Sequence, residues 1–163
     1  EESLHYVENA MKKARKIGDR FGIHTIADDS GLEVDALSAR PGVFSSRYGR
    51  TDAERIERLL FELKGVPWEK RRAVFKAFIV FYLPEQERGY IFYGYLSGFI
   101  GFEMRGKAGF GFDPVFYVPE LQKHLAELDI DEKNRLSHRG KAIFAFKDFV
   151  NMNFFKRPRG LSL

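Results

Sequence analysis

Two adjacent carboxylates, Asp28 and Asp29, followed by Ser30 and a glycine, carry the clearest chemical signal in this sequence. An apolar run at residues 23–27 precedes them, so the sequence predicts two short strands joined by this acidic turn, with the carboxylates at a strand end. Strand ends are where α/β folds bind ligands, and Mg²⁺ is satisfied by one or two carboxylates together with substrate phosphates. Adjacent side chains on extended backbone point to opposite sides, so at most one of the pair faces a given site. The simpler alternative is a turn in which an aspartate bonds nearby backbone.

A glycine-rich loop at residues 106–114, with the sequence GKAGFGFDP, is typical of a site for a flat ligand. Glycine lets the backbone approach a ligand closely, and the rings of Phe110 and Phe112 could stack on a base. The alternative is a loop that closes a hairpin and buries its phenylalanines in the core.

A third cluster combines a cation, a hydroxyl, an imidazole and a guanidinium at a predicted helix start: Lys133, Ser137, His138 and Arg139. The N-terminus of a helix offers free N–H groups and arginine offers fixed donors, so the cluster favours an oxygen-rich ligand. A solvated, capped helix start is the alternative. Lys13 lies among other lysines on an earlier helix, where a solvated face is the simpler interpretation.

Two helices are predicted around the first of these clusters. Apolar residues recur at three- and four-residue spacing through residues 4–21 and predict an amphipathic helix that ends near Gly18 or Gly22. Residues 51–54, Thr-Asp-Ala-Glu, form a capping-box pattern at the start of a second helix, which Gly65 ends.

Two long apolar segments, 72–83 and 90–100, predict a hairpin that is covered on both faces. An apolar run at 115–118 follows the glycine-rich loop, and Asp129 and Ser137 are candidate caps of two further helices. Helices interleaved with a mostly apolar sheet indicate an α/β domain.

Length and composition narrow the function classes. The 163 residues predict one domain over residues 1–163, and the lack of cysteine excludes disulfides, zinc ribbons and thiol nucleophiles. The net charge of +4 predicts weak attraction to phosphates and not a nucleic-acid scaffold. The longest apolar stretch, 77–83, is too short to span a membrane and no secretory signal opens the chain, so the cytoplasm is the expected compartment. The polar, basic tail at 156–163 is expected to fray.

Five stretches occur in the order found in one family, and they are spread over nearly the whole chain, from residue 6 to residue 142. The chain therefore resembles the inosine triphosphate pyrophosphatases, which are hydrolases of non-standard purine nucleoside triphosphates. The matching stretches are YVENAMKKA (6–14), ADDSGLEVDAL (27–37), RPGVFSSRY (40–48), GFGFDPVF (109–116) and EKNRLSHRGKA (132–142).

The resemblance implies an α/β fold with a mixed, elongated central sheet flanked by helices in two lobes, with a cleft between them. It implies Mg²⁺ dependence and hydrolysis of ITP, dITP or XTP to the monophosphate and pyrophosphate, by water attack on the α-phosphorus. The expected partners are this nucleotide and a second copy of the chain in a homodimer, with no nucleic acid or membrane. The family also has a strand and a Thr-Gly-Asn-x-x-Lys phosphate loop ahead of the point that matches residue 1, so the domain is expected to lack that segment here.

Residue roles follow from the resemblance position by position. Asp29 matches the residue that binds metal and acts as the base toward water, and Asp28 lies beside it as a further metal ligand. Glu1 matches the upstream metal carboxylate, or Glu2 if a one-residue gap is allowed. Lys13 matches the helix lysine that meets phosphate.

The remaining matches imply a nucleotide pocket. Arg139 can only donate hydrogen bonds, so the oxygen at position six of hypoxanthine or xanthine suits it, whereas the amino group of adenine does not. We expect Asp29 to face the same groove as Phe110 and His138. Phe112 stands where the family often has Tyr or Trp. The substrate contacts implied by the resemblance are Ser30, Phe110, Gly111, Phe112, Asp113, Lys133, His138 and Arg139.

Two other functions are alternatives. One is a Maf-like pyrimidine nucleotide pyrophosphatase, which preference for dTTP or UTP would favour. The other is a basic RNA-binding module that stacks bases on Phe110 and Phe112, which steep salt-dependent RNA affinity without turnover would favour. The predicted hairpin lacks the basic and aromatic signature of an RNA-recognition motif.

Overall fold

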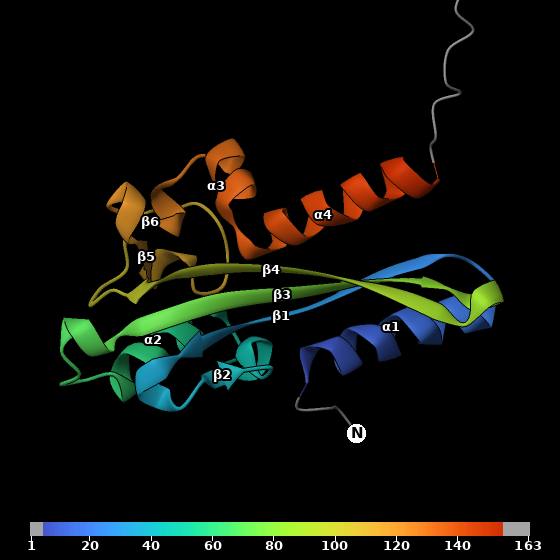
Figure 1. Cartoon of the computed structure of the whole chain (residues 1–163). Helices are drawn as coiled ribbons and strands as arrows, with labels where there is room; N and C mark the ends of the chain where they lie inside the picture. The colour runs from blue at the N-terminus through green and yellow to red at the C-terminus, as the bar shows by residue number, and fades with distance from the viewer. Residues whose placement is uncertain (1–4, 155–163) are drawn as a thin grey trace, which may run out of the picture.

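The computed structural model describes residues 5–154, which form a six-stranded sheet with helices on both faces (Figure 1). The strand order is β2-β1-β3-β4-β5-β6, and each of these neighbouring pairs is antiparallel. The predicted α/β class is thereby confirmed. The helices are α1 (Tyr6–Phe21), α2 (Asp52–Glu62), α3 (Ile130–Leu136) and α4 (His138–Asn153), and the strands are β1 (Thr25–Val34), β2 (Arg40–Gly42), β3 (Arg72–Leu83), β4 (Arg88–Ile100), β5 (Phe116–Val118) and β6 (Lys123–His124).

Three long strands, β1, β3 and β4, run along the molecule (Figure 1). All 10 residues of β1 pair with β3, and all 12 residues of β3 pair with β4, which confirms the predicted hairpin. Because these backbone ladders are continuous, the strands join the two ends of the sheet into one body.

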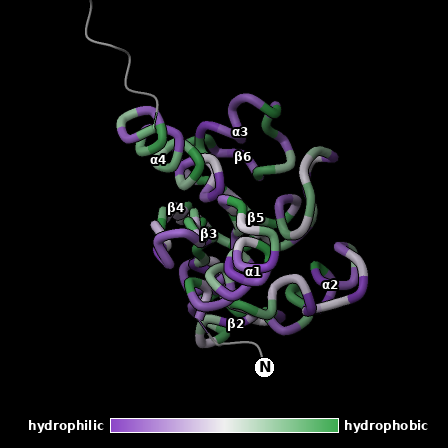
Figure 2. Tube along the Cα trace, turned by 90° about the vertical axis from the view of Figure 1, so that its right-hand side faces the viewer, coloured by the Kyte–Doolittle hydropathy of each residue, from purple (hydrophilic) through white to green (hydrophobic). Residues whose placement is uncertain are grey.

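One end of the sheet lies between α1 and α4, which cover opposite faces (Figure 1). Alternation along β3 sends Val80 and Tyr82 into the cluster with α1, and Ile79 and Phe81 into the cluster with Ala142 of α4. Viewed from the side, the trace of α1 carries hydrophilic and hydrophobic segments in turn, as expected for a helix with one face against a sheet (Figure 2).

The other end holds the largest hydrophobic core. Leu59 of α2 and Leu32 of β1 are fully buried there. Phe75 of β3 and Phe116 of β5 pack with their ring centroids 4.6 Å apart. This core fixes the loop between β4 and β5, which carries the glycine-rich segment.

The helix ends agree with the local sequence signals. α1 ends at Gly22, whose φ of 64° is left-handed and whose N–H donates to the carbonyl of Gly18. The side chains of Thr51, Asp129 and Ser137 cap α2, α3 and α4 as predicted.

The acidic turn predicted at Asp28 and Asp29 is wrong, because both residues lie within the continuous strand β1. Asp28 lies opposite Ile79 and Asp29 lies opposite Phe78. The carboxylates are therefore in mid-strand and not at a strand end. Pairing with the long strand β3 supplies backbone hydrogen bonds that outweigh the turn preference of Asp, Ser and Gly.

Gly31, which favours a turn in the sequence, instead permits a close approach. A Cβ atom at this position would lie 2.2 Å from the carbonyl oxygen of Gly42 in β2 and 2.8 Å from the hydroxyl of Tyr6 in α1. Glycine is therefore required for β2 and α1 to pack against β1 at this point.

One face of β4 is exposed, so the prediction of a hairpin covered on both faces is wrong for this strand. Ile91, Tyr93 and Tyr95 alternate along β4 with about half of each side chain accessible.

No helix within residues 5–154 is long and apolar enough to cross a membrane. Glu1 and the tail at 156–163 lie outside the described residues.

Candidate functional site

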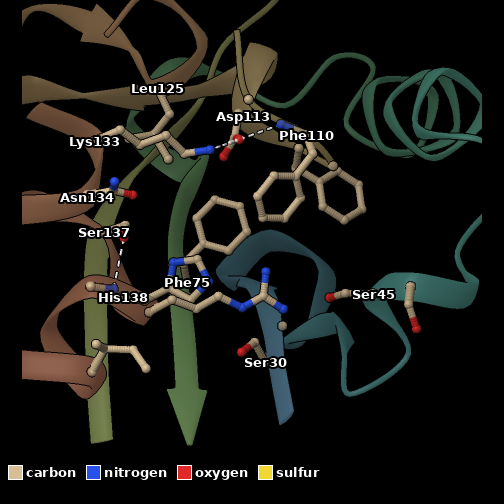
Figure 3. Close-up of a pocket in the computed structure, with 18 of the residues that line it drawn as sticks. Ser30, Ser45, Phe75, Phe110, Asp113, Leu125, Lys133, Asn134, Ser137 and His138 are labelled. Carbon is tan, nitrogen blue, oxygen red and sulfur yellow. Dashed lines mark hydrogen bonds and ion pairs between the residues drawn. The ribbon is translucent and has the colours of Figure 1, made fainter. Parts of the chain in front are cut away.

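A cavity of about 770 Å³ lies between β1, β3, the glycine-rich loop and the starts of α3 and α4, which is within the size range of small-molecule sites. Figure 3 shows Phe75 and His138 side by side, with Ser30 and Ser45 on the opposite wall. The fold thus brings together three clusters that are far apart in the sequence. The predicted substrate contacts that line the cavity are Ser30, Phe110, Gly111, Phe112, Asp113, Lys133, His138 and Arg139.

The glycine-rich loop is held to α3 by a buried ion pair. Asp113 Oδ2 accepts hydrogen bonds from the backbone N of Phe110 at 2.7 Å and from Lys133 Nζ at 2.5 Å (Figure 3). Lys133 Nζ also lies 4.5 Å from the centroid of the Phe110 ring. Because Asp113 already neutralises Lys133, this pair acts mainly to shape the loop around the cavity.

The two phenylalanines of the loop have different surroundings. Phe112 is 3% exposed and packs edge-on against Tyr48, so it anchors the loop in the core. Phe110 is 58% exposed and lines the cavity. Phe112 therefore fits the interpretation in which the loop buries its ring in the core, and Phe110 fits the interpretation in which a ring stacks on a ligand.

His138 opens α4 as a buried, uncharged imidazole. Its ring stacks on Phe75 with the centroids 4.7 Å apart and the planes within 6°. Burial, together with the nearby charges of Arg139 and Lys133, lowers the pKa of His138 to about 3. Its Nδ1 atom is buried without a hydrogen-bond partner among the described residues.

Arg139, the next residue of α4, forms an ion pair with Asp28. Arg139 Nε donates to Asp28 Oδ2 at 3.0 Å, and the hydroxyl of Ser30 donates to the same oxygen at 2.9 Å. Burial raises the pKa of Asp28, but the charge of Arg139 and these hydrogen bonds outweigh it and leave the pKa below its usual value. The Arg139 guanidinium also lies 5.4 Å from the centroid of the Phe110 ring.

Asp29 faces the other side of β1, toward α1. Its Oδ1 accepts from Lys13 Nζ at 2.6 Å and its Oδ2 accepts from Asn9 Nδ2 at 3.2 Å. Lys13 Nζ also donates to the carbonyl of Asp28 at 3.0 Å. The expectation that Asp29 faces the groove of Phe110 and His138 is therefore wrong, because strand alternation places Asp28 on that side and Asp29 on the opposite one.

The two carboxylates lie on opposite faces of β1. Among the described residues, β2 pairs with β1 only from Leu32 onward, so residues 25–31 have a strand partner, β3, on one side.

Metal ligands are few within residues 5–154, where no group of three or more acidic or histidine side chains is arranged to hold an ion. Asp28 and Asp29 supply carboxylate oxygens, which are the donors that Mg²⁺ prefers. Because the two carboxylates face opposite sides of β1, an ion on one face would take one of them and complete its shell with substrate phosphates and water.

Sequence reasoning missed two residues of this region. Asn9 lies one helical turn before Lys13, and that spacing is a signal for a shared face of α1. Phe75 belongs to a strand in which almost every residue is apolar, so the sequence offers no sign that it supports His138.

Comparisons with known proteins point in one direction. The sequence model of the Ham1 family matches residues 1–149. The chain is 47% identical over 147 residues to a dITP/XTP pyrophosphatase of Yersinia pestis. The aligned region covers 88% of this chain and 75% of that protein. The structure of a HAM1 protein from Coxiella burnetii is similar with a TM-score of 0.88 and 44% identity, over 92% of this chain and 78% of that one. The Staphylococcus aureus Ham1 protein is similar with a TM-score of 0.85 and 39% identity, over 90% and 77% of the two chains.

Proposed function

The chain belongs to the Ham1 family, and on this basis we propose that it hydrolyses the non-standard purine nucleoside triphosphates ITP, dITP and XTP to the monophosphate and pyrophosphate. The observation that supports this most is the cavity in which Phe110 lies against two cations beside a buried, uncharged His138. An aromatic ring, fixed donors and a neutral imidazole suit an oxo-purine base.

Base selection follows from the donors. Arg139 can only donate, so an acceptor oxygen at position six of the purine suits it, whereas the amino group of adenine would set one donor against another. Such a mismatch costs about 1–3 kcal/mol. His138 stays uncharged at neutral pH and can donate from one nitrogen and accept at the other.

The hydrolytic step is assigned to the face of β1 that carries Asp29. A water oxygen bonds to the α-phosphorus while the bond from that phosphorus to the bridging oxygen breaks, and pyrophosphate leaves with the electron pair. Asp29 accepts the proton of the water, and Asn9 and Lys13 hold its carboxylate in place. Mg²⁺, for which Asp28, Asp29 and Glu1 are the proposed ligands, supplies charge neutralisation at the phosphates when bound.

A substrate panel tests this proposal. Pyrophosphate release is measured with Mg²⁺ for ITP, dITP and XTP, and for ATP, GTP, dTTP and UTP, with and without a chelator. We expect the three oxo-purine nucleotides to be cleaved at least about tenfold more efficiently than ATP, and the chelator to abolish activity. Faster cleavage of dTTP or UTP would support a Maf-like pyrimidine enzyme instead. Salt-dependent RNA binding without turnover would support an RNA-binding module.

We also propose a homodimer that acts in the cytoplasm. The homodimer that the family resemblance implies supports the first point, as does the half-exposed apolar face of β4 at Ile91, Tyr93 and Tyr95. The cytoplasmic location is proposed because the substrates are nucleoside triphosphates. Light scattering should give about twice the 18.9 kDa mass of the chain, and a mass of one chain would contradict the dimer.

A further inference from the structure

We propose that Asp52, in the first turn of α2, is a positioning residue for the purine pocket. Its carboxylate links two parts of the cavity wall, the glycine-rich loop and Arg55, although Asp52 itself does not line the cavity. This inference rests on the proposed function for the identity of the ligand. The geometry of the link does not depend on it.

The two carboxylate oxygens of Asp52 have different partners. Oδ2 accepts from the backbone N of Gly111 at 2.6 Å, across 59 positions of sequence. Oδ1 accepts from Arg55 Nη1 at 2.5 Å, within α2. A carboxylate in the first turn of a helix is commonly explained by the helix dipole, but that role needs no contact with a distant loop. The bond to Gly111 is therefore the informative one.

This bond completes the fixing of Phe110. The N–H of Phe110 donates to Asp113, and the next N–H along the chain, that of Gly111, donates to Asp52. The peptide groups on both sides of Phe110 are thus held by carboxylates from different parts of the fold. Because those two peptides set the backbone conformation of Phe110, they also set the direction in which its ring projects.

The loop needs such a restraint. Gly109 and Gly111 both have left-handed φ values, 82° and 62°, and glycine loses more conformational entropy on ordering than any other residue. The Phe110 ring is more than half exposed, so core packing does not hold it. Without Asp52, the loop keeps its attachment to α3 through Asp113 and loses its attachment to α2.

The same carboxylate also holds a cation of the cavity wall. Arg55 lines the cavity, and its Nε donates to the carbonyl of Gly49 at 3.1 Å. Asp52 supplies its charge partner, with the Arg55 side chain 22% exposed. Loss of Asp52 would therefore release the stacking ring and leave Arg55 without this counter-charge.

Steady-state kinetics with ITP test the proposal. Because the loop contacts the base and not the reacting phosphorus, D52A should raise KM about fivefold to thirtyfold and change kcat less than about twofold. D52N keeps an oxygen that can accept from Gly111 and should recover most of the loss. E54A is the matched control, since Glu54 lies in the same turn but accepts from the N of Arg50 and does not reach the loop, and its KM should be unchanged.

A second measurement needs no substrate. The amide of Gly111 should exchange with solvent at least about tenfold faster in D52A than in the wild type, by NMR, and at the wild-type rate in E54A. Equal exchange rates in D52A and wild type would overturn the proposal, as would an unchanged KM or a fall in kcat that matches the rise in KM. If the wild type cleaves no purine triphosphate while Asp52 protects Gly111, the link is supported and the proposed function is the part that fails.

Discussion

Neighbouring carboxylates on one strand serve different faces of the sheet. Asp28 pairs with Arg139 beside the cavity, and Asp29 pairs with Lys13 of α1 on the other side. The separation follows from strand alternation and not from sequence distance. Substitutions at these two positions should therefore have different kinetic effects.

Asp29→Asn should lower kcat for ITP by about 10²–10⁴-fold while nucleotide still binds, because an amide cannot take the proton of the attacking water. Pyrophosphate release gives kcat, and calorimetry with ITP gives binding. Asp35→Asn, a carboxylate exposed just after β1, is the control and should behave as wild type. Wild-type turnover by Asp29→Asn would remove Asp29 from the mechanism.

Arg139→Ala should narrow the preference for ITP over ATP. Removing the donor takes away the penalty that adenine suffers, about 1–3 kcal/mol, so the ratio of kcat/KM values should fall about fivefold or more. Arg135→Ala changes an exposed arginine of α3 and should leave the ratio as it is. An unchanged ratio in Arg139→Ala would mean that position six of the base is read by another group.

The pH dependence of stability should report His138. Burial lowers the pKa of His138 to about 3, whereas an imidazole in the unfolded chain has a pKa near 6.5. Between these values the unfolded chain binds a proton that the folded protein does not, so the free energy of unfolding falls as the pH drops. From pH 7 to pH 5 this amounts to about 2 kcal/mol.

Urea unfolding at several pH values measures that contribution. His138→Gln should lose less stability between pH 7 and pH 5 than the wild type does, whatever its stability at pH 7. His5→Gln, at an exposed position before α1, should keep the wild-type dependence. Identical pH dependences for His138→Gln and the wild type would show that His138 is not the residue responsible.

At the scale of the elements, the buried side chain of Arg71 joins the end of α2 to the end of β4. Arg71 is 2% exposed, and its guanidinium donates to four main-chain carbonyls at the ends of these elements. Burial lowers the pKa of Arg71. The acceptors are the carbonyls of Leu63, Val66, Ile100 and Gly101.

Arg71→Met should therefore destabilise the fold by about 3 kcal/mol or more, because several buried carbonyls lose their donor together. The free energy of unfolding in urea measures the effect. Arg72→Met, at the exposed next position, should change it by less than about 0.5 kcal/mol. A small effect of Arg71→Met would mean that water replaces the guanidinium at these carbonyls.

Both ends of the protein share the three long strands, so we expect them to unfold together. The largest core lies at one end, and the clusters with α1 and α4 lie at the other, yet β3 contributes to all three. Continuous strand pairing links these clusters.

Trp68 stacks on Phe99 near the end of β4 with 5.0 Å between centroids, and it is the sole tryptophan of the sequence. Its fluorescence and the far-ultraviolet circular dichroism should therefore give coincident urea transitions. Ile79→Ala, in the cluster with α4, should lower the free energy of unfolding by about 2–5 kcal/mol and by the same amount in both signals. Leu121→Ala, at an exposed position, should shift neither. Separate transitions would show that the two ends are independent.

Features that depend on near neighbours could be predicted from the amino-acid sequence. The caps at Thr51, Asp129 and Ser137, the left-handed end of α1 at Gly22 and the β3–β4 hairpin all follow from local hydrogen bonding and hydrophobic spacing. The chemical types at the cavity were also recognisable, because carboxylates, cations and aromatic rings keep their preferences in any fold.

Features that depend on distant segments required the three-dimensional structure. Strand pairing with β3 turns the Asp-Asp-Ser-Gly segment into mid-strand, and alternation then sends Asp29 toward α1. Packing decides that Phe112 is buried while Phe110 faces the cavity, and that Asp52 reaches Gly111. These outcomes are set by contacts between residues tens of positions apart, for which neither periodicity nor turn preference carries a signal.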